Sequence, residues 1–254
     1  MQYKALKDFL EEKTRKYNRP EFIETDPIQV PKKFENKENI EIAGFLTATI
    51  SWGSRQSIIK NAMRMVSAMD FQPRDFVLNS TPANLRALEK FAHRTFNGDD
   101  CLYFIRALKN IYQNYDGLQQ VFENGYRQEK SVKSALLHFH NLFFELKGER
   151  TRKHVSNVGK GASAKRLNMF LRWMVRKDKN GVDFGIWKEI PTAALMLPLD
   201  VHTGNTARKL GLLKRKSNDW KAVEEVTSEL RNFDPEDPVK YDFALFGLGV
   251  FEKF

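Results

Sequence analysis

Two short segments carry residues whose types and spacing could do chemistry. In "LPLDVHTGNTARKLG" (residues 197–211), Asp200 follows an apolar run, and His202 comes two residues later. In "GKGASAKRLNMFLRWMVRK" (residues 159–177), a Gly-x-Gly sequence and a run of small residues lead to Lys165. A lysine amine with a carboxylate to take its proton is a pair that nucleophilic catalysis uses. The two segments are therefore the candidates for an active site.

Lys165 falls in the first turn of a helix that apolar periodicity predicts over residues 165–176. The positive end of the helix dipole and the neighbouring Arg166 both disfavour a charged amine there, which is the condition for a nucleophilic lysine. We expect Arg166, Arg172 and Arg176 on one face and an opposite, buried stripe made of Leu167, Phe170, Leu171 and Met174. The residues alone equally allow Lys165 to contact only phosphate, because small residues and helix N-terminal amides favour phosphate binding.

Asp200 stands where the pattern predicts the start of another helix, over residues 203–210. Its side chain could cap the amides that follow while one oxygen faces a substrate, where a carboxylate stabilises positive charge growing on a sugar. The alternative is that Asp200 is an N-cap and nothing more, since Asp is among the preferred residues at that position.

The elements that must position these residues are helical, so we predict an all-α protein with short loops. Strand signals are sparse, and a helical pattern over residues 40–69 breaks at Gly53 in "SWGS". Further helices are predicted from Thr81 onward and over residues 98–115, 131–146, 190–197, 220–233 and 238–247. The basic, glycine-containing stretch 147–163 could be a linker, a disordered loop or a phosphate-binding hairpin.

Composition narrows the class of protein. The chain has 254 residues, one cysteine, Cys101, and a formal net charge of +10. One cysteine excludes an internal disulfide, a cysteine-ligated zinc site and an iron–sulfur cluster, and the five histidines are scattered, so we expect no metal and no cofactor. No apolar run is long enough to cross a bilayer and the N-terminus has no signal-peptide pattern, so we expect a cytoplasmic protein without a membrane partner. The positive charge favours nucleic acid as the partner.

The segment around Asp200 resembles the motif of the helix-hairpin-helix DNA glycosylases, above all the 8-oxoguanine glycosylase branch and a bacterial family of similar length. Residues 159–165 are similar to the Gly-x-Gly hairpin before that superfamily's catalytic lysine, and "TATISWGSRQSIIKNAMRMV" (residues 47–66) to its early helix–break–helix. The resemblance covers residues 40–254. It implies one glycosylase-like unit over residues 1–254, with lobes 40–146 and 147–254, a cleft between them, and residues 1–39 packed on the second lobe.

The resemblance also implies roles for particular residues. Lys165 matches the nucleophile and Asp200 the essential aspartate. DNA-binding residues would be Gly159, Lys160, Gly161, Ser163, Arg166, His202 and Arg208. The base pocket or the wedge that fills the duplex would use Ser51, Trp52, Arg55, Met169 and Phe246, although Trp52 and Phe246 could equally be core aromatics.

The activity that this family implies is DNA repair: base flipping, excision of an oxidised purine such as 8-oxoguanine, and AP lyase cleavage through a lysine Schiff base. The expected partner is double-stranded DNA with a damaged base, bound by a monomer in the bacterial nucleoid. The implied activity needs no metal and no cofactor.

Three departures from the family pattern qualify the resemblance. Two extra residues separate Gly161 from Lys165, which makes Lys160 a competing nucleophile. Lys165 and Asp200 are 35 positions apart, with residues 178–187 as an insertion. The missing cysteine quartet argues against the endonuclease III and adenine-mismatch branches. A non-catalytic DNA- or RNA-binding helical protein is the alternative.

Overall fold

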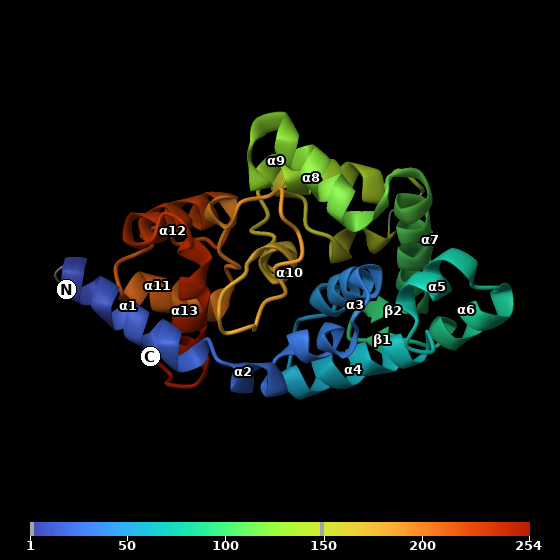
Figure 1. Cartoon of the computed structure of the whole chain (residues 1–254), viewed down its shortest axis with the longest axis horizontal. Helices are drawn as coiled ribbons and strands as arrows, with labels where there is room; N and C mark the ends of the chain where they lie inside the picture. Colours follow the sequence, from blue (N-terminus) through green and yellow to red (C-terminus); the bar gives the residue numbers. More distant parts are fainter. Residues whose placement is uncertain (1–2, 148–149) are drawn as a thin grey trace. The chain divides into compact units, whose positions relative to one another are not determined.

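Helices make up nearly all the regular structure of the computed structural model, which describes residues 3–147 and 150–254 (Figure 1). The all-α prediction is confirmed. Within the described residues the one exception is an antiparallel ribbon of β1 (Ala92–His93) and β2 (Phe96–Asn97), whose two-residue strands are too short to leave a periodic signal. No described helix combines the length and the apolar composition that crossing a bilayer requires.

The chain divides into two compact units. The composite unit joins the N-terminal segment up to Ile23 with Asn157–Phe254, and the central unit is Glu24–Ser156. The short helix α2 (Pro20–Thr25) spans the boundary between them. These limits differ from the predicted lobes 40–146 and 147–254, most of all at the N-terminus.

The composite unit contains both chemistry-bearing segments. Its α-helices are α1 (Tyr3–Tyr17), α10 (Lys165–Val175), α11 (Val201–Lys209), α12 (Trp220–Phe233) and α13 (Tyr241–Val250). Its 3-10 helices are η4 (Val158–Lys160), η5 (Thr192–Ala194) and η6 (Pro238–Lys240). α13 packs against both α1 and α11 (Figure 1). Gly247 permits the close approach of α1, because a Cβ there would lie 2.1 Å from the Tyr17 ring.

The central unit is built around a cluster of aromatic rings that includes Phe45, Phe104, Phe139 and Phe143. Its α-helices are α3 (Lys37–Thr49), α4 (Arg55–Ser67), α5 (Pro73–Asn79), α6 (Pro82–Glu89), α7 (Gly98–Asn114), α8 (Gly117–Glu129) and α9 (Val132–Phe143). Its 3-10 helices are η1 (Pro27–Gln29), η2 (Pro31–Lys33) and η3 (Arg150–His154). The predicted break between α3 and α4 is confirmed, with Gly53 at a φ of 101° and Ser54 capping α4.

Two sequence-based predictions about local structure are wrong. Residues 190–197 form only the 3-10 helix η5, because Pro191 and Pro198 interrupt a regular helix. The N-terminal extension does not pack as one piece: η1 and η2 contact α3 and bury Ile28 and Val30 in the central unit. For residues 147–163, where the sequence leaves a linker, a disordered loop and a phosphate-binding hairpin as alternatives, the described part contains the 3-10 helices η3 and η4.

Candidate active site

The structure brings Lys165 and Asp200 together. The Lys165 Nζ atom lies 3.9 Å from the Asp200 Oδ2 atom, and both side chains belong to the composite unit. Lys165 is the first residue of α10 and Asp200 immediately precedes α11. About a quarter of each side chain is exposed, 26% for Lys165 and 25% for Asp200, so the pair is accessible to a substrate.

Asp200 is held in place by the start of α11. Its Oδ1 atom accepts a hydrogen bond from the Thr203 amide at 3.0 Å, and its own amide donates to Thr203 Oγ1 at 2.9 Å, which is a reciprocal capping box. The Asn218 side chain donates to the Asp200 carbonyl at 3.0 Å. Because one carboxylate oxygen caps the helix, Oδ2 is the oxygen left to face Lys165.

Lys165 is positioned by the glycine-containing turn before it. The Asn157 side chain caps η4, and Gly161 follows with a φ of 82°, a conformation that favours glycine. The Gly161 carbonyl accepts a hydrogen bond from the Trp220 amide at 2.9 Å, which ties the turn to the start of α12. Ala164 then takes a left-handed conformation with a φ of 51°, and α10 begins at the next residue.

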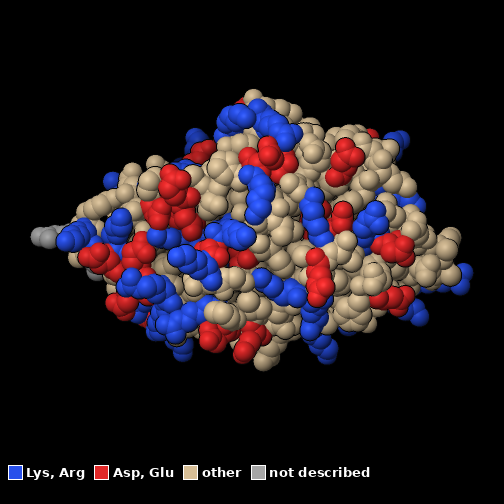
Figure 2. Space-filling view, viewed as in Figure 1, with Lys and Arg blue, Asp and Glu red and all other residues tan. Residues whose placement is uncertain are grey.

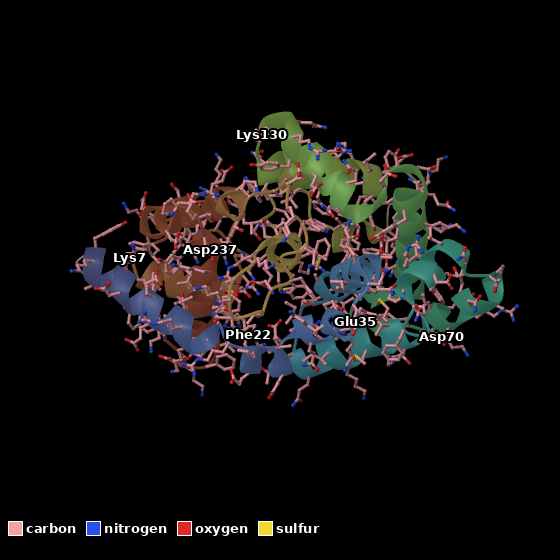
Figure 3. All side chains as sticks on the ribbon, in the orientation of Figure 1. Lys7, Phe22, Glu35, Asp70, Lys130 and Asp237 are labelled. Carbon is pink, nitrogen blue, oxygen red and sulfur yellow. The ribbon has the colours of Figure 1, made fainter. Side chains whose placement is uncertain are left out.

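A buried ionic network lies along the same helix. Asp183 accepts hydrogen bonds from Arg172 at 3.2 Å and from Arg176 at 3.0 Å. Arg176 also pairs with Asp237, labelled in Figure 3, at 2.9 Å and with Asp178 at 2.8 Å. The prediction that Arg172 and Arg176 lie on an exposed basic face is therefore wrong. Residues 178–187, read from the sequence as an insertion, supply two of the carboxylates that balance these buried cations.

Asp242 also belongs to this site, although no sequence pattern above predicts it. It lies in the first turn of α13, and its carboxylate hydrogen-bonds to Arg172. Burial raises the pKa of Asp242 to about 6; Arg172 opposes the shift, Asp200 adds to it, and Lys165 opposes it. The Asp242 carboxylate therefore lies within electrostatic reach of both members of the Lys165–Asp200 pair. A single acid in the otherwise apolar run "YDFALFGLG" was the signal that could have found it.

The residues predicted to bind DNA lie in different environments of the composite unit. Gly159, Lys160, Gly161 and His202 are exposed, whereas Ser163 and Arg166 are half-buried. Burial lowers the pKa of Arg166 to about 10, which leaves it charged at neutral pH. The exposed members remain available to a ligand, and their contact with DNA stays a prediction.

Arg208 differs from the other predicted DNA contacts because its guanidinium is engaged within the protein. Its Nε atom donates to the Arg215 carbonyl at 2.8 Å, and Nη2 donates to the Asn218 side chain at 2.6 Å. Asn218 in turn holds the Asp200 carbonyl. Arg208 therefore supports the turn that positions Asp200.

Residues predicted to form a base pocket or a wedge fall in both units. In the composite unit Met169 is 8% exposed, and Phe246 is half-buried with its ring edge-on to Phe22 (labelled in Figure 3) and to Phe251. Phe246 thus has the contacts of a core aromatic on at least two sides. Its role in binding a base stays a prediction.

The other three wedge candidates lie in the central unit. The Ser51 hydroxyl donates to the Thr47 carbonyl at 2.8 Å, and Arg55 pairs with Asp26 at 3.3 Å. The Trp52 ring stacks on His154 at 5.8 Å and meets His93 edge-on at 5.1 Å. These contacts explain how the three side chains are held in the fold, and their insertion into a duplex stays a prediction.

The surface charge does not gather into one basic field on the face shown in Figure 2, where Lys and Arg are interspersed with Asp and Glu. A basic binding region must therefore be located from particular side chains. Among residues 3–147 and 150–254 no group of three His, Cys, Asp or Glu side chains could hold a metal ion. Cys101 is buried, and burial raises the pKa of its thiol far above the usual range.

The fold and site define an all-α protein with an accessible lysine–aspartate pair at two helix starts. Residues 26–251 match the family model described as "Protein of unknown function (DUF2400)". Because this match covers most of the chain, the protein belongs to that family. No curated protein and no solved structure matches the chain.

Proposed function

We propose that the protein is a DNA N-glycosylase with AP lyase activity that removes an oxidised purine, such as 8-oxoguanine, from double-stranded DNA. The observation that carries the proposal is the 3.9 Å approach of Lys165 Nζ to Asp200 Oδ2, at the end of a glycine-containing turn. The resemblance to helix-hairpin-helix glycosylases supplies the reaction, and the geometry supports the two roles it needs.

The reaction begins with the damaged nucleotide flipped out of the duplex, since the target bond is inaccessible inside it. As the bond between C1′ and the base nitrogen breaks, its electron pair leaves with the base, which takes up a proton. Positive charge grows on the sugar, and Asp200 stabilises it electrostatically. The Lys165 amine forms a bond to C1′ and passes a proton to the Asp200 carboxylate.

The sugar ring then opens by cleavage of the C1′–O4′ bond, and O4′ is protonated as a Schiff base forms between Lys165 and C1′. Loss of a C2′ proton drives β-elimination, in which the C3′–O3′ bond breaks and the 3′ strand leaves as a phosphate. Water hydrolyses the Schiff base and returns the free lysine. Every bond made or broken uses the amine, the carboxylate, water and the DNA itself.

Borohydride trapping tests the proposal, because reduction of the Schiff base links protein and DNA covalently. The wild-type protein should be trapped on a duplex with one 8-oxoguanine and not on the undamaged duplex. Lys165→Gln should abolish trapping, whereas Lys160→Gln, which removes the exposed competing lysine from the same turn, should retain it. Trapping that survives in Lys165→Gln would show that the nucleophile is another residue.

The capping box favours a second function, a non-catalytic nucleic-acid-binding protein. Asp200 already has a complete structural role as the N-cap of α11, so its presence does not require chemistry. This alternative predicts binding without strand cleavage. A nicking assay on an abasic duplex distinguishes the two functions, and competition between duplex DNA and a structured RNA identifies the preferred nucleic acid if no cleavage occurs.

A further inference from the structure

A pocket of about 500 Å³ lies in the composite unit between α11 and the end of the chain. His202, Asn205 and Lys209 line it from α11, where spacings of three, four and seven residues place side chains on one helix face. Lys253 and Phe254 line it from the segment after α13. Gly249 lets the two helices approach closely beneath it, because a Cβ there would lie 2.9 Å from the Thr206 hydroxyl.

The pocket is lined by basic and neutral side chains. Lys209, Lys253 and Arg208 line it together with His202, and no acidic residue of the described chain does. Elsewhere in the composite unit basic side chains pair with carboxylates: Lys13 and Lys16 with Glu252, and Lys240 with Glu11 and Asp234. Among the described residues no carboxylate lies within ion-pair distance of Lys209 or Lys253. Cations gathered in a concave site without internal counterions favour an anionic ligand.

The position of the pocket indicates which anion it fits. His202 lies in the first turn of α11, two residues after Asp200, so the pocket extends along α11 from the helix start that holds Asp200. Lys209 is seven positions after His202, which is about 10 Å of α-helix. One strand of duplex DNA rises about 3.4 Å along the duplex axis for each nucleotide, so this length corresponds to about three nucleotides of a duplex whose axis runs along α11. The exposed ring of Phe254 adds an apolar surface, 41% exposed, beside the cations.

We propose that this pocket binds the phosphodiester backbone of the DNA strand that carries the damaged nucleotide, about three nucleotides from it, with Lys209 and Lys253 as phosphate ligands. The inference rests on the proposed function, since it takes Asp200 as the place where the damaged sugar lies. It adds a phosphate-binding segment made by α11 and the end of the chain to the glycine turn already predicted to contact DNA. Its ligand is defined by charge and spacing and does not depend on base sequence.

The test measures DNA binding at several salt concentrations, using a duplex with one tetrahydrofuran abasic analogue that cannot be processed. The pocket variant is Lys209→Ala/Lys253→Ala. The matched control is Lys4→Ala/Lys179→Ala, which removes two exposed lysines of the composite unit that belong neither to the pocket nor to the glycine turn. Removing one lysine that binds a phosphate should reduce the slope of log K against log salt by about 1. We expect a reduction of about 2 for the pocket variant and a wild-type slope for the control.

Ethylation interference on the same duplex locates the contacts. Modified phosphates on the lesion strand, about three nucleotides from the analogue, should weaken wild-type binding, and this interference should disappear in the pocket variant. An unchanged slope and an unchanged interference pattern would overturn the proposal, as would an equal decrease of slope in the control. Calorimetric titration with inorganic phosphate provides another arm: pocket-dependent phosphate binding with an unchanged DNA slope would show a small-anion site instead.

These outcomes separate the pocket from the proposed chemistry. A pocket-dependent slope without Lys165-dependent borohydride trapping would reject the glycosylase and keep the DNA-binding pocket. Trapping that depends on Lys165, without a pocket-dependent slope, would keep the glycosylase and reject the DNA-binding pocket.

Discussion

Asp200 and Thr203 each accept a hydrogen bond from the other's backbone amide at the start of α11. The Asp200 Oδ2 atom takes no part in these bonds and lies 3.9 Å from the Lys165 amine. The helix start therefore fixes the carboxylate before any substrate arrives, which is how enzymes orient a charged group at low cost. The interpretations of Asp200 as a cap and as a charge-stabilising group are compatible, because each uses a different oxygen.

Because the two Asp200 oxygens have different roles, Asp200→Asn and Thr203→Ala should have different consequences. Asp200→Asn keeps a good N-cap and should change the free energy of unfolding by no more than about 0.5 kcal/mol. It removes the negative charge, so borohydride trapping on 8-oxoguanine DNA should fall by on the order of a hundredfold or more. Thr203→Ala removes the return hydrogen bond and should cost about 1 kcal/mol of stability while trapping persists.

Chemical denaturation measures the stabilities, and single-turnover trapping measures the chemistry. If Asp200→Asn is less stable and its trapping falls only by the fraction of the variant that is unfolded, the carboxylate matters only as a cap.

The buried network on α10 predicts a large stability effect at Asp183. Its carboxylate is fully buried and hydrogen-bonds to both Arg172 and Arg176. Asp183→Asn leaves these two buried cations short of one counterion, and we expect it to destabilise the protein by about 3–5 kcal/mol. Asp178→Asn is the matched control from the same segment, because its side chain is 19% exposed and should cost about 1 kcal/mol. Similar denaturation midpoints for the two variants would contradict this account.

Backbone geometry predicts a stabilising substitution away from the site. Lys130, labelled in Figure 3, ends α8 with a φ of 53°, a left-handed conformation that costs a non-glycine residue about 1 kcal/mol. Lys130→Gly should therefore raise the free energy of unfolding by roughly that amount. Lys109→Gly, in the interior of α7, should lower it by about 1 kcal/mol, since glycine is a poor helix former. Thermal unfolding of both variants would show opposite shifts, and trapping should not change in either.

Much of the fold follows from local sequence. Apolar periodicity located α10 and α12 closely, although α10 is buried on all sides after its first turn, and Ser54 with Gly53 marked the start of α4. The helix that the apolar run between Pro191 and Pro198 predicts over residues 190–197 does not form, and the segment contains only η5. The prediction for residues 24–39 is also wrong, because burial of Ile28 and Val30 against α3 and α4 depends on tertiary contacts that no local pattern reports.

In the candidate site, too, the features that depend on tertiary contacts could not be predicted from the sequence. Lys165 and Asp200 were found because each begins a helix and lies in a recognisable motif. Asp242 was missed because its importance comes from burial beside Arg172, and the sequence gives no sign that α13 lies there. Arg172 was misassigned to an exposed face because its counterions come from residues 183 and 242, which are distant in the sequence.

Asp242 also predicts a specific pH dependence of stability. Its pKa is about 6 in the folded protein against an ordinary 3.8, so the folded state binds the proton more tightly than the unfolded state. With more protons on the folded state, the stability that Asp242 contributes falls as pH rises from about 4 to about 6, and is constant above that range. The shift corresponds to a change on the order of 3 kcal/mol.

The measurement is the difference in unfolding free energy between the wild-type protein and Asp242→Asn at a series of pH values. Groups that titrate alike in both proteins cancel in that difference, so what remains reports Asp242 together with Arg172, Asp200, Lys165 and Asp183, which act on it electrostatically. We expect the wild-type protein to lose stability relative to the variant between about pH 4 and pH 6. A difference that is constant between about pH 4 and pH 6 and rises with pH only below about pH 4 would mean that the attraction of Arg172 outweighs burial, and the Asp242 carboxylate would then be ionised over the whole range from about pH 4 to pH 6.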